Sequence, residues 1–138
     1  MRITLRDYEK SFVALLSSEN SLHYSPLSII ESKWILLSLI RKNKLDAQRA
    51  LTRFVAGLKT ILEGGIELNP TDFTSPEIEG RADLLWGAGI DDYFDRMLVA
   101  TAIIHGMTLI TEDKEISALA KRVGVSIKDW STLVQYIR

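Results

Sequence analysis

Two carboxylates in the stretch Gly89–Ile116 lie where acidic side chains can bind a metal ion. Asp95 falls in the first turn of a predicted helix, and Asp113 follows a short apolar segment that is typical of a buried strand. In open α/β sheets, ligands bind outside the carboxyl ends of the strands, which is where we expect Asp113. The alternative is structural, because aspartate is favoured at helix N-termini: Asp92 and Asp95 could cap one helix and Asp113 the next. Each acid alone is better explained as a cap, so only their combination indicates a site.

A third acidic side chain, Glu31, lies one turn before Trp34 on nearly the same apolar side of a long predicted helix. Glu31 also has capping-box spacing from Ser28, which is an open alternative if the helix begins later than expected. Three carboxylates at one sheet edge repel one another, so such a cluster requires a bound cation, a proton or an arginine. The chain has no cysteine, and His23 and His105 are not spaced as a ligand pair. Oxygen ligands for Mg²⁺ or Mn²⁺ are therefore expected rather than a zinc site.

A divalent cation held by Glu31, Asp95 and Asp113 would make a water molecule nucleophilic and shield charge on a phosphate, so phosphodiester hydrolysis is the expected chemistry. Thr111 could hydrogen-bond a ligating carboxylate or a metal-bound water, although threonine at a strand end is more often structural. Arg96 could contact the phosphate or pair with a neighbouring acid, and the salt bridge is the more common role.

The elements expected to position these residues are short strands that alternate with longer helices. Helices are predicted over residues 4–18, 26–40, 46–63, 76–86, 92–105, 114–122 and 130–137, and strands over 22–24, 66–68, 107–111 and 125–127. Ser25-Pro26 and Ser75-Pro76 each place a capping residue before a proline at the first helical position, and Thr4 and His105 are expected to cap their own helices. This alternation implies right-handed crossovers and a parallel sheet with helices on both faces. The expected fold class is α/β, a three-layer α/β/α sandwich with a short parallel sheet.

The composition is that of an ordinary globular protein. Of the 138 residues, 46% are hydrophobic and 25% are charged, which predicts a single domain over residues 1–138. We expect a cytoplasmic protein without a membrane partner, because the sequence has neither a membrane-length apolar run nor the apolar core of a signal peptide. The formal net charge of −1 provides no global basic field, so nucleic-acid binding needs a local patch. The densest basic group, Arg41, Lys42 and Lys44, is better explained by its place after a helix, where cations meet the carboxyl end of the dipole.

Two segments resemble a known family, the PIN domains, which include the VapC-type ribonuclease toxins and related archaeal and bacterial proteins. The run DRMLVATAIIHGMTLITED is similar to the family's Asp, buried helix, glycine, apolar strand and Thr-x-Asp, and HYSPLSIIESKWILLSLIRK is similar to its second-strand segment with the following helix. The resemblance covers about residues 8–128 and implies a metal-dependent endoribonuclease-like hydrolase that cleaves RNA. Glu31, Asp95 and Asp113 would be its catalytic and metal-binding residues, with Asp91 or Asp92 as auxiliary acids. An antitoxin protein and a second copy of the chain are the partners that the resemblance and the small size suggest.

The chain departs from this family at its beginning. PIN domains usually open on an apolar strand that ends in Asp followed by Thr or Ser, and no such segment is present in this sequence. The nearest acid, Asp7, lies in a segment whose apolar residues Leu5 and Phe12 have helical spacing, so Asp7 is not expected to be the missing ligand. Either the usual first strand lies upstream or this is a divergent member without it, and the strand edges would then need another cover. The alternative function is a catalytically impaired PIN-like module that binds RNA or protein.

Overall fold

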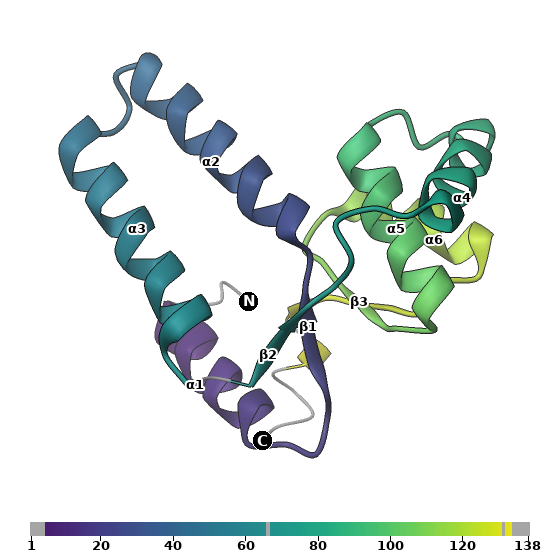
Figure 1. Ribbon diagram of the computed structural model, residues 1–138, viewed down its shortest axis with the longest axis horizontal. Helices are drawn as coiled ribbons and strands as arrows, with labels where there is room; N and C mark the ends of the chain where they lie inside the picture. The colour runs from purple at the N-terminus through teal and green to yellow at the C-terminus, as the bar shows by residue number, and fades with distance from the viewer. Residues whose placement is uncertain (1–4, 66, 131, 134–138) are drawn as a thin grey trace. The chain divides into compact units, whose positions relative to one another are not determined.

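The computed structural model describes residues 5–65, 67–130 and 132–133 (Figure 1). In chain order, the elements of these ranges are α1 (Leu5–Leu16), β1 (Leu22–Tyr24), α2 (Pro26–Arg41), α3 (Ala47–Glu63), β2 (Leu68–Pro70), α4 (Pro76–Gly87), α5 (Tyr93–His105), β3 (Leu109–Ile110), α6 (Lys114–Val123) and β4 (Ile127–Lys128). The chain forms two compact units. The inserted unit is Ser21–Phe73, and the discontinuous unit combines Met1–Asn20 with Thr74–Arg138.

The inserted unit consists of a helical hairpin between two parallel strands. β1 pairs with β2 in the register Leu22 to Leu68 and Tyr24 to Pro70, and the Thr71 amide extends the ladder by donating to the Tyr24 carbonyl at 2.9 Å. The intervening chain forms α2 and α3, which run side by side in Figure 1. Asn43, with φ of 54°, provides the left-handed residue in the turn between them. Strand, hairpin and strand therefore form one parallel crossover unit.

The helices of the inserted unit bury few of their side chains. Leu27 is the buried residue of α2, and none of the residues of α3 is buried. Contacts between the two helices include the Lys33 ammonium group, which lies 4.6 Å from the centre of the Phe54 ring. Many side chains of α2 and α3 are consequently partly or fully exposed to solvent.

The discontinuous unit contains the best-packed part of the described chain, where α4 lies against α5 (Figure 1). From α4, Ile78 and Ala82 are fully buried, and from α5, Met97 and Val99 have exposed fractions of 1% and 0%. α5 is apolar nearly all round, and this explains why it is buried on more than one side. Gly106, with φ of 62°, ends α5 in the left-handed conformation that glycine adopts at little cost. The chain then enters β3, which pairs in parallel with β4.

The α/β class and the parallel strand pairing are confirmed. The six helices expected between residues 4 and 122 are present, and the helix predicted over 4–18 is observed as Leu5–Leu16. The strand predicted over 22–24 is observed with these limits, whereas 66–68 is observed as 68–70, 107–111 as 109–110, and 125–127 as 127–128. The four described strands also form two separate pairs rather than one sheet. Strands of two or three residues make few ladder hydrogen bonds, so neighbouring turns and caps determine where each one begins and ends.

Two sequence expectations fall wholly or partly outside the described residues. Thr4, the expected cap of α1, lies outside them, as does most of the predicted helix over 130–137, of which residues 130, 132 and 133 are helical. Within the described ranges, no helix is long and apolar enough to cross a bilayer. That residues 1–138 form a single domain stays a prediction.

Candidate functional site

The first turn of α5 holds two of the candidate acids in a defined arrangement. Asp92 is the N-cap residue, and its Oδ1 accepts the Asp95 amide N–H at 3.1 Å. This bond confirms the capping role expected of Asp92. Asp95 is half-buried, and its carboxylate lies at the positive end of the helix dipole, where a negative charge is stabilised. The local sequence therefore anchors the Asp95 backbone at the entrance of a buried helix.

The second acidic position follows β3 and begins α6. Asp113 Oδ1 accepts the amide N–H groups of Glu115 at 2.8 Å and of Ile116 at 3.1 Å, so the expected cap of this helix is confirmed. Both bonds use Oδ1, which leaves the second oxygen, Oδ2, outside the cap. The Asp113 side chain is exposed, so Oδ2 faces an environment in which a hydrated cation can approach.

Thr111 positions Asp113 through the backbone. The Asp113 amide donates to the Thr111 hydroxyl oxygen at 3.1 Å, and the Thr111 amide donates to the Lys128 carbonyl at 3.1 Å. The threonine thus connects the last bond of the β3–β4 ladder to the loop that carries the acid. This is the structural role considered from the sequence, exerted on the Asp113 amide rather than on its carboxylate.

Arg96 makes a contact that differs from both roles expected from the sequence. Its guanidinium carbon lies 5.9 Å from the centre of the Trp86 ring and 5.6 Å from that of Tyr93. Its Nε is buried and has no hydrogen-bond partner among the described residues. Arg96 therefore stacks between aromatic rings of α4 and α5, and a planar guanidinium is well suited to this contact.

A polar network beside this stack was not expected from the sequence. Glu79 Oε1 accepts hydrogen bonds from the Tyr93 hydroxyl at 2.6 Å and from the Thr74 hydroxyl at 2.8 Å. The bond from Tyr93, followed by that from Thr74, lowers the pKa of Glu79 below its ordinary value. The same bond to Glu79 raises the pKa of Tyr93, and burial adds to this increase. Glu79 and Tyr93 are far apart in sequence, so only the packing of α4 against α5 could indicate their pairing.

Glu31 belongs to the inserted unit, where it is half-buried on α2. This helix begins at Pro26 with Ser25 as its N-cap residue. Ser28 is consequently inside the helix rather than at its cap, and the capping-box alternative for Glu31 is wrong. The Ser25 side chain makes no capping hydrogen bond to any described residue, so only its position, and not its bond, agrees with the expected cap.

The candidate metal ligands can be compared with the needs of a divalent cation. The structure brings Asp92 together with Asp95, and Thr111 together with Asp113. Among residues 5–65, 67–130 and 132–133, no group of three or more His, Asp or Glu side chains could hold a metal ion. The donor set Glu31, Asp95 and Asp113 nevertheless fits a hard cation chemically, because all its ligand atoms are carboxylate oxygens.

The inserted unit contains a pocket that was not expected from the sequence. Its volume is about 360 Å³, and its lining is mainly apolar, with Phe54, Leu58 and Ile61 from α3 facing Ile29 from α2. Three serine side chains and Arg53 are also part of the lining. A wall of this composition suits apolar groups rather than a phosphodiester.

Comparison with known protein families identifies one match that covers most of the chain. Residues 4–122 match the PIN domain family. No curated protein matches the chain. The matched range contains all three candidate acids together with Asp92, Arg96 and Thr111.

Proposed function

Because the chain belongs to the PIN domain family, which has a nuclease-like fold, we propose that it is a divalent-metal-dependent endoribonuclease. Nuclease domains of this family generally act on RNA and generally depend on a divalent metal. The observation that supports the proposal most directly is the pair of anchored carboxylates at two helix entrances. Asp95 follows its Asp92 cap, and Asp113 keeps one oxygen outside its own cap.

Glu31, Asp95 and Asp113 are the residues that would hold Mg²⁺ or Mn²⁺. When bound, such a cation supplies a nucleophilic water and neutralises the charge that develops on the scissile phosphate. Asp92 limits the movement of Asp95 through the bond to its amide, and Thr111 does the same for Asp113. These backbone anchors reduce the entropy lost when carboxylates are ordered around a ligand. Arg96 acts through the aromatic stack beside Asp95 and orders the start of α5.

The test is cleavage of single-stranded RNA by the full chain with Mg²⁺, with Mn²⁺ or with EDTA. We expect cleavage only with metal, and a loss of roughly 100-fold or more in Asp95→Asn and in Asp113→Asn. Asparagine is also a good N-cap residue, so Asp113→Asn preserves the helix start while it removes the charge. Asp83→Asn, an exposed change on α4, is the matched control and should leave cleavage unchanged. Cleavage that persists in EDTA, or that survives Asp95→Asn, would contradict the proposal.

A second candidate function is a catalytically impaired module that binds RNA or protein. The observation that favours it is α1, since the segment around Asp7 is helical and not the strand that usually carries the family's first acid. For this function, Asp113→Asn should leave RNA binding intact, and titration with Mn²⁺ should show no saturable site. A saturable Mn²⁺ site that is lost in Asp95→Asn would exclude it.

The biological setting is proposed on the family resemblance alone. The chain would act in the cytoplasm as the toxin of a toxin–antitoxin pair, with an antitoxin protein and a second copy of the chain as partners. Growth arrest on expression, relieved by a gene product encoded beside it, would support the toxin role. Growth arrest that is unchanged in Asp95→Asn would contradict it.

A further inference from the structure

The charges of the chain are unevenly distributed. Residues 32–62 contain seven basic residues and one acidic residue, Asp46, so their net charge is +6. The whole chain has a net charge of −1, which means that all other residues together carry −7. We call the segment 32–62 the basic hairpin; it contains most of α2 and α3 and the turn between them. The seven basic residues are Lys33, Arg41, Lys42, Lys44, Arg49, Arg53 and Lys59.

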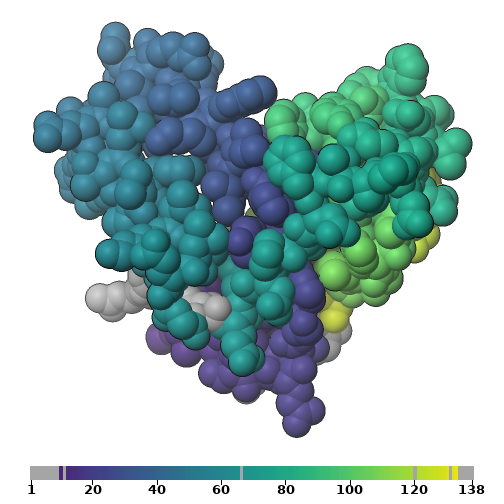
Figure 2. Space-filling model, in the orientation of Figure 1, coloured from purple at the N-terminus to yellow at the C-terminus, as the bar shows by residue number. Residues whose placement is uncertain are grey.

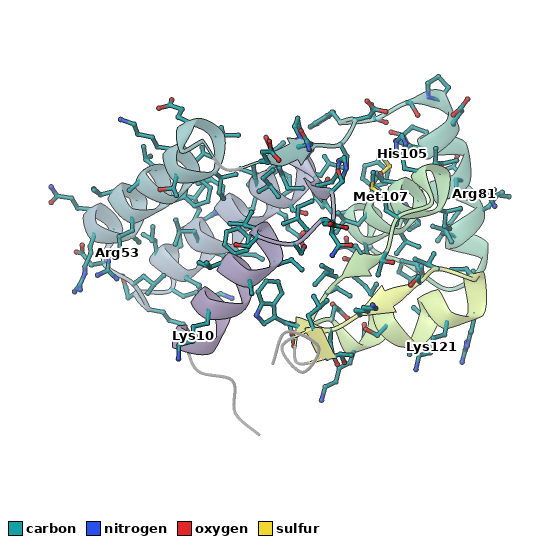
Figure 3. All side chains as sticks on the ribbon, turned by 90° about the horizontal axis from the view of Figure 1, so that it is seen from below. Lys10, Arg53, Arg81, His105, Met107 and Lys121 are labelled. Atoms are coloured by element: carbon teal, nitrogen blue, oxygen red, sulfur yellow. The ribbon has the colours of Figure 1, made fainter. Side chains whose placement is uncertain are left out.

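Most of these cations are available to a partner. Lys33 is half-buried over Phe54, whereas the other six basic side chains are exposed. Figure 2 shows the side chains of α2 and α3, in blue to teal, at the surface of the molecule. Arg53 points away from α3 into solvent (Figure 3). A strongly positive, solvated surface is therefore present on a chain that is slightly acidic overall.

The favourable interaction of cations with the C-terminus of a helix explains the placement of only some of these basic residues. Arg41 follows the expected pattern, since it lies in the last turn of α2 and its Nε donates to the Leu37 carbonyl at 3.3 Å. Lys44 and Arg49 have the opposite placement, because they flank the N-terminus of α3, where the dipole disfavours positive charge. The first turn of α3 contains no acidic residue, and the one nearby acid, Asp46, caps the helix by accepting the Arg49 amide at 2.8 Å. The dipole of α3 therefore does not explain the placement of Lys44 and Arg49.

Arg49 and Arg53 also share one side of α3. They are four residues apart, so they lie on the same face about 6 Å apart along the axis. Lys44 precedes the helix, so Lys44, Arg49 and Arg53 form a row of positive charges that begins at the positive end of the α3 dipole. A linear polyanion with regularly spaced phosphates complements such a row.

We propose that the basic hairpin binds the phosphate backbone of the RNA substrate through Lys44, Arg49 and Arg53. This inference rests on the proposed ribonuclease function, to which it adds the surface that holds the substrate. Contacts to phosphates provide affinity without sequence preference, so this surface determines how tightly RNA binds rather than where it is cut.

The test measures binding of a fluorescently labelled single-stranded RNA to the full chain in EDTA, over a range of KCl concentrations. The hairpin variant replaces Lys44, Arg49 and Arg53 with glutamine. The control variant makes the same replacement at Arg81, Lys121 and Arg122, exposed residues of the other unit, of which Arg81 and Lys121 are labelled in Figure 3. Far-ultraviolet circular dichroism is used to check that both variants are folded. Both lose three positive charges, so net charge cannot explain a difference between them.

We expect the hairpin variant to lose roughly tenfold or more in affinity, and the slope of log K against log[KCl] to fall by about 2, since each phosphate contact contributes about 0.7. The control variant should keep the wild-type slope. Equal losses in both variants, or no RNA binding by the wild type, would overturn the proposal. Binding to phosphatidylglycerol vesicles, but not RNA, with the same dependence on the hairpin would overturn it in favour of a membrane surface.

The outcomes also separate this proposal from the proposed function. Hairpin-dependent binding without metal-dependent cleavage would retain the RNA surface and reject the ribonuclease. Cleavage by a hairpin variant with unchanged RNA affinity would retain the ribonuclease and reject the surface.

Discussion

The two helix pairs of this protein, α4–α5 and α2–α3, differ in packing. Ile78, Met97 and Val99 are fully buried where α4 meets α5, whereas Trp34, Ile35 and Val55 of α2 and α3 have exposed fractions of 60%, 55% and 60%. The first pair carries Asp95 and its cap, and the second carries the basic hairpin. Catalytic carboxylates must be held within narrow limits, while contacts to a flexible polyanion need charge more than rigidity. The difference in packing therefore agrees with a division between a positioning region and a binding region.

The largest expected difference between the two pairs is the loss of unfolding free energy when an apolar side chain is truncated to alanine. Met97→Ala in α5 should lower the free energy of unfolding by about 2–5 kcal/mol, because Met97 is 1% exposed and its removal leaves a cavity. Leu62→Ala in α3 removes a side chain of similar size that is 54% exposed, and should cost about 0.5 kcal/mol or less. Urea unfolding, followed by circular dichroism, measures both. Equal costs would mean that the two pairs do not differ in packing.

A smaller difference is expected at the starts of α4 and α2, each of which has a serine before a proline. The Ser75 hydroxyl oxygen accepts the Ile78 amide at 3.1 Å, so Ser75→Ala should cost about 1 kcal/mol in stability. Ser25 makes no such bond to a described residue, so Ser25→Ala should change stability by less than about 0.5 kcal/mol. The same urea titration compares them, and a larger cost at Ser25 would contradict the observed geometry.

The smallest expected effect is a pH dependence that is confined to the α4–α5 pair. The pKa of Glu79 is lowered from its ordinary value of 4.5, so its bond to Tyr93 stabilises the fold above 4.5 and is lost as the pH falls through the folded pKa. The pKa of Tyr93 is raised from 10.0, so this stabilisation is present below 10.0 and is lost as the pH rises through the folded pKa. Tyr93→Phe keeps the ring and should remove roughly 0.5 kcal/mol between these values.

The measurement is the difference in unfolding free energy between wild type and Tyr93→Phe across the pH range. This difference should be constant between pH 4.5 and pH 10.0 and should decrease at lower and at higher pH. Tyr24→Phe, in the inserted unit, is the control for loss of a tyrosine hydroxyl and should give a difference without this shape. A Tyr93→Phe difference that grows in acid would contradict the assigned direction.

Sequence reasoning was most successful for interactions within one turn of the chain. The caps formed by Asp92, Asp113 and Ser75 were all expected, because a cap joins a side chain to an amide two or three residues later. It was less successful for three of the four described strands, whose limits differ by one or two residues. Very short strands have too few apolar alternations for their ends to be read from the pattern.

For the candidate site, too, the sequence indicated the residues but not the contacts between helices. The assignment of Glu31, Asp95 and Asp113 as metal ligands came from the sequence and stays a prediction. The environment of Arg96 could not be foreseen, because Trp86 lies on another helix and an arginine beside an aspartate suggests a salt bridge. Its stacking depends on a packing angle that the local sequence does not specify.

The sequence by itself determined most of the helices, the caps formed by Ser75, Asp92 and Asp113, the α/β class and the excess of positive charge in residues 32–62, since each follows from neighbouring residues or from composition. Only the tertiary structure decided that Arg96 lies against the Trp86 ring, that Tyr93 bonds to Glu79 and that α3 buries none of its residues. These features require contacts between residues far apart in the chain, and such contacts depend on how whole helices pack rather than on what any one segment prefers.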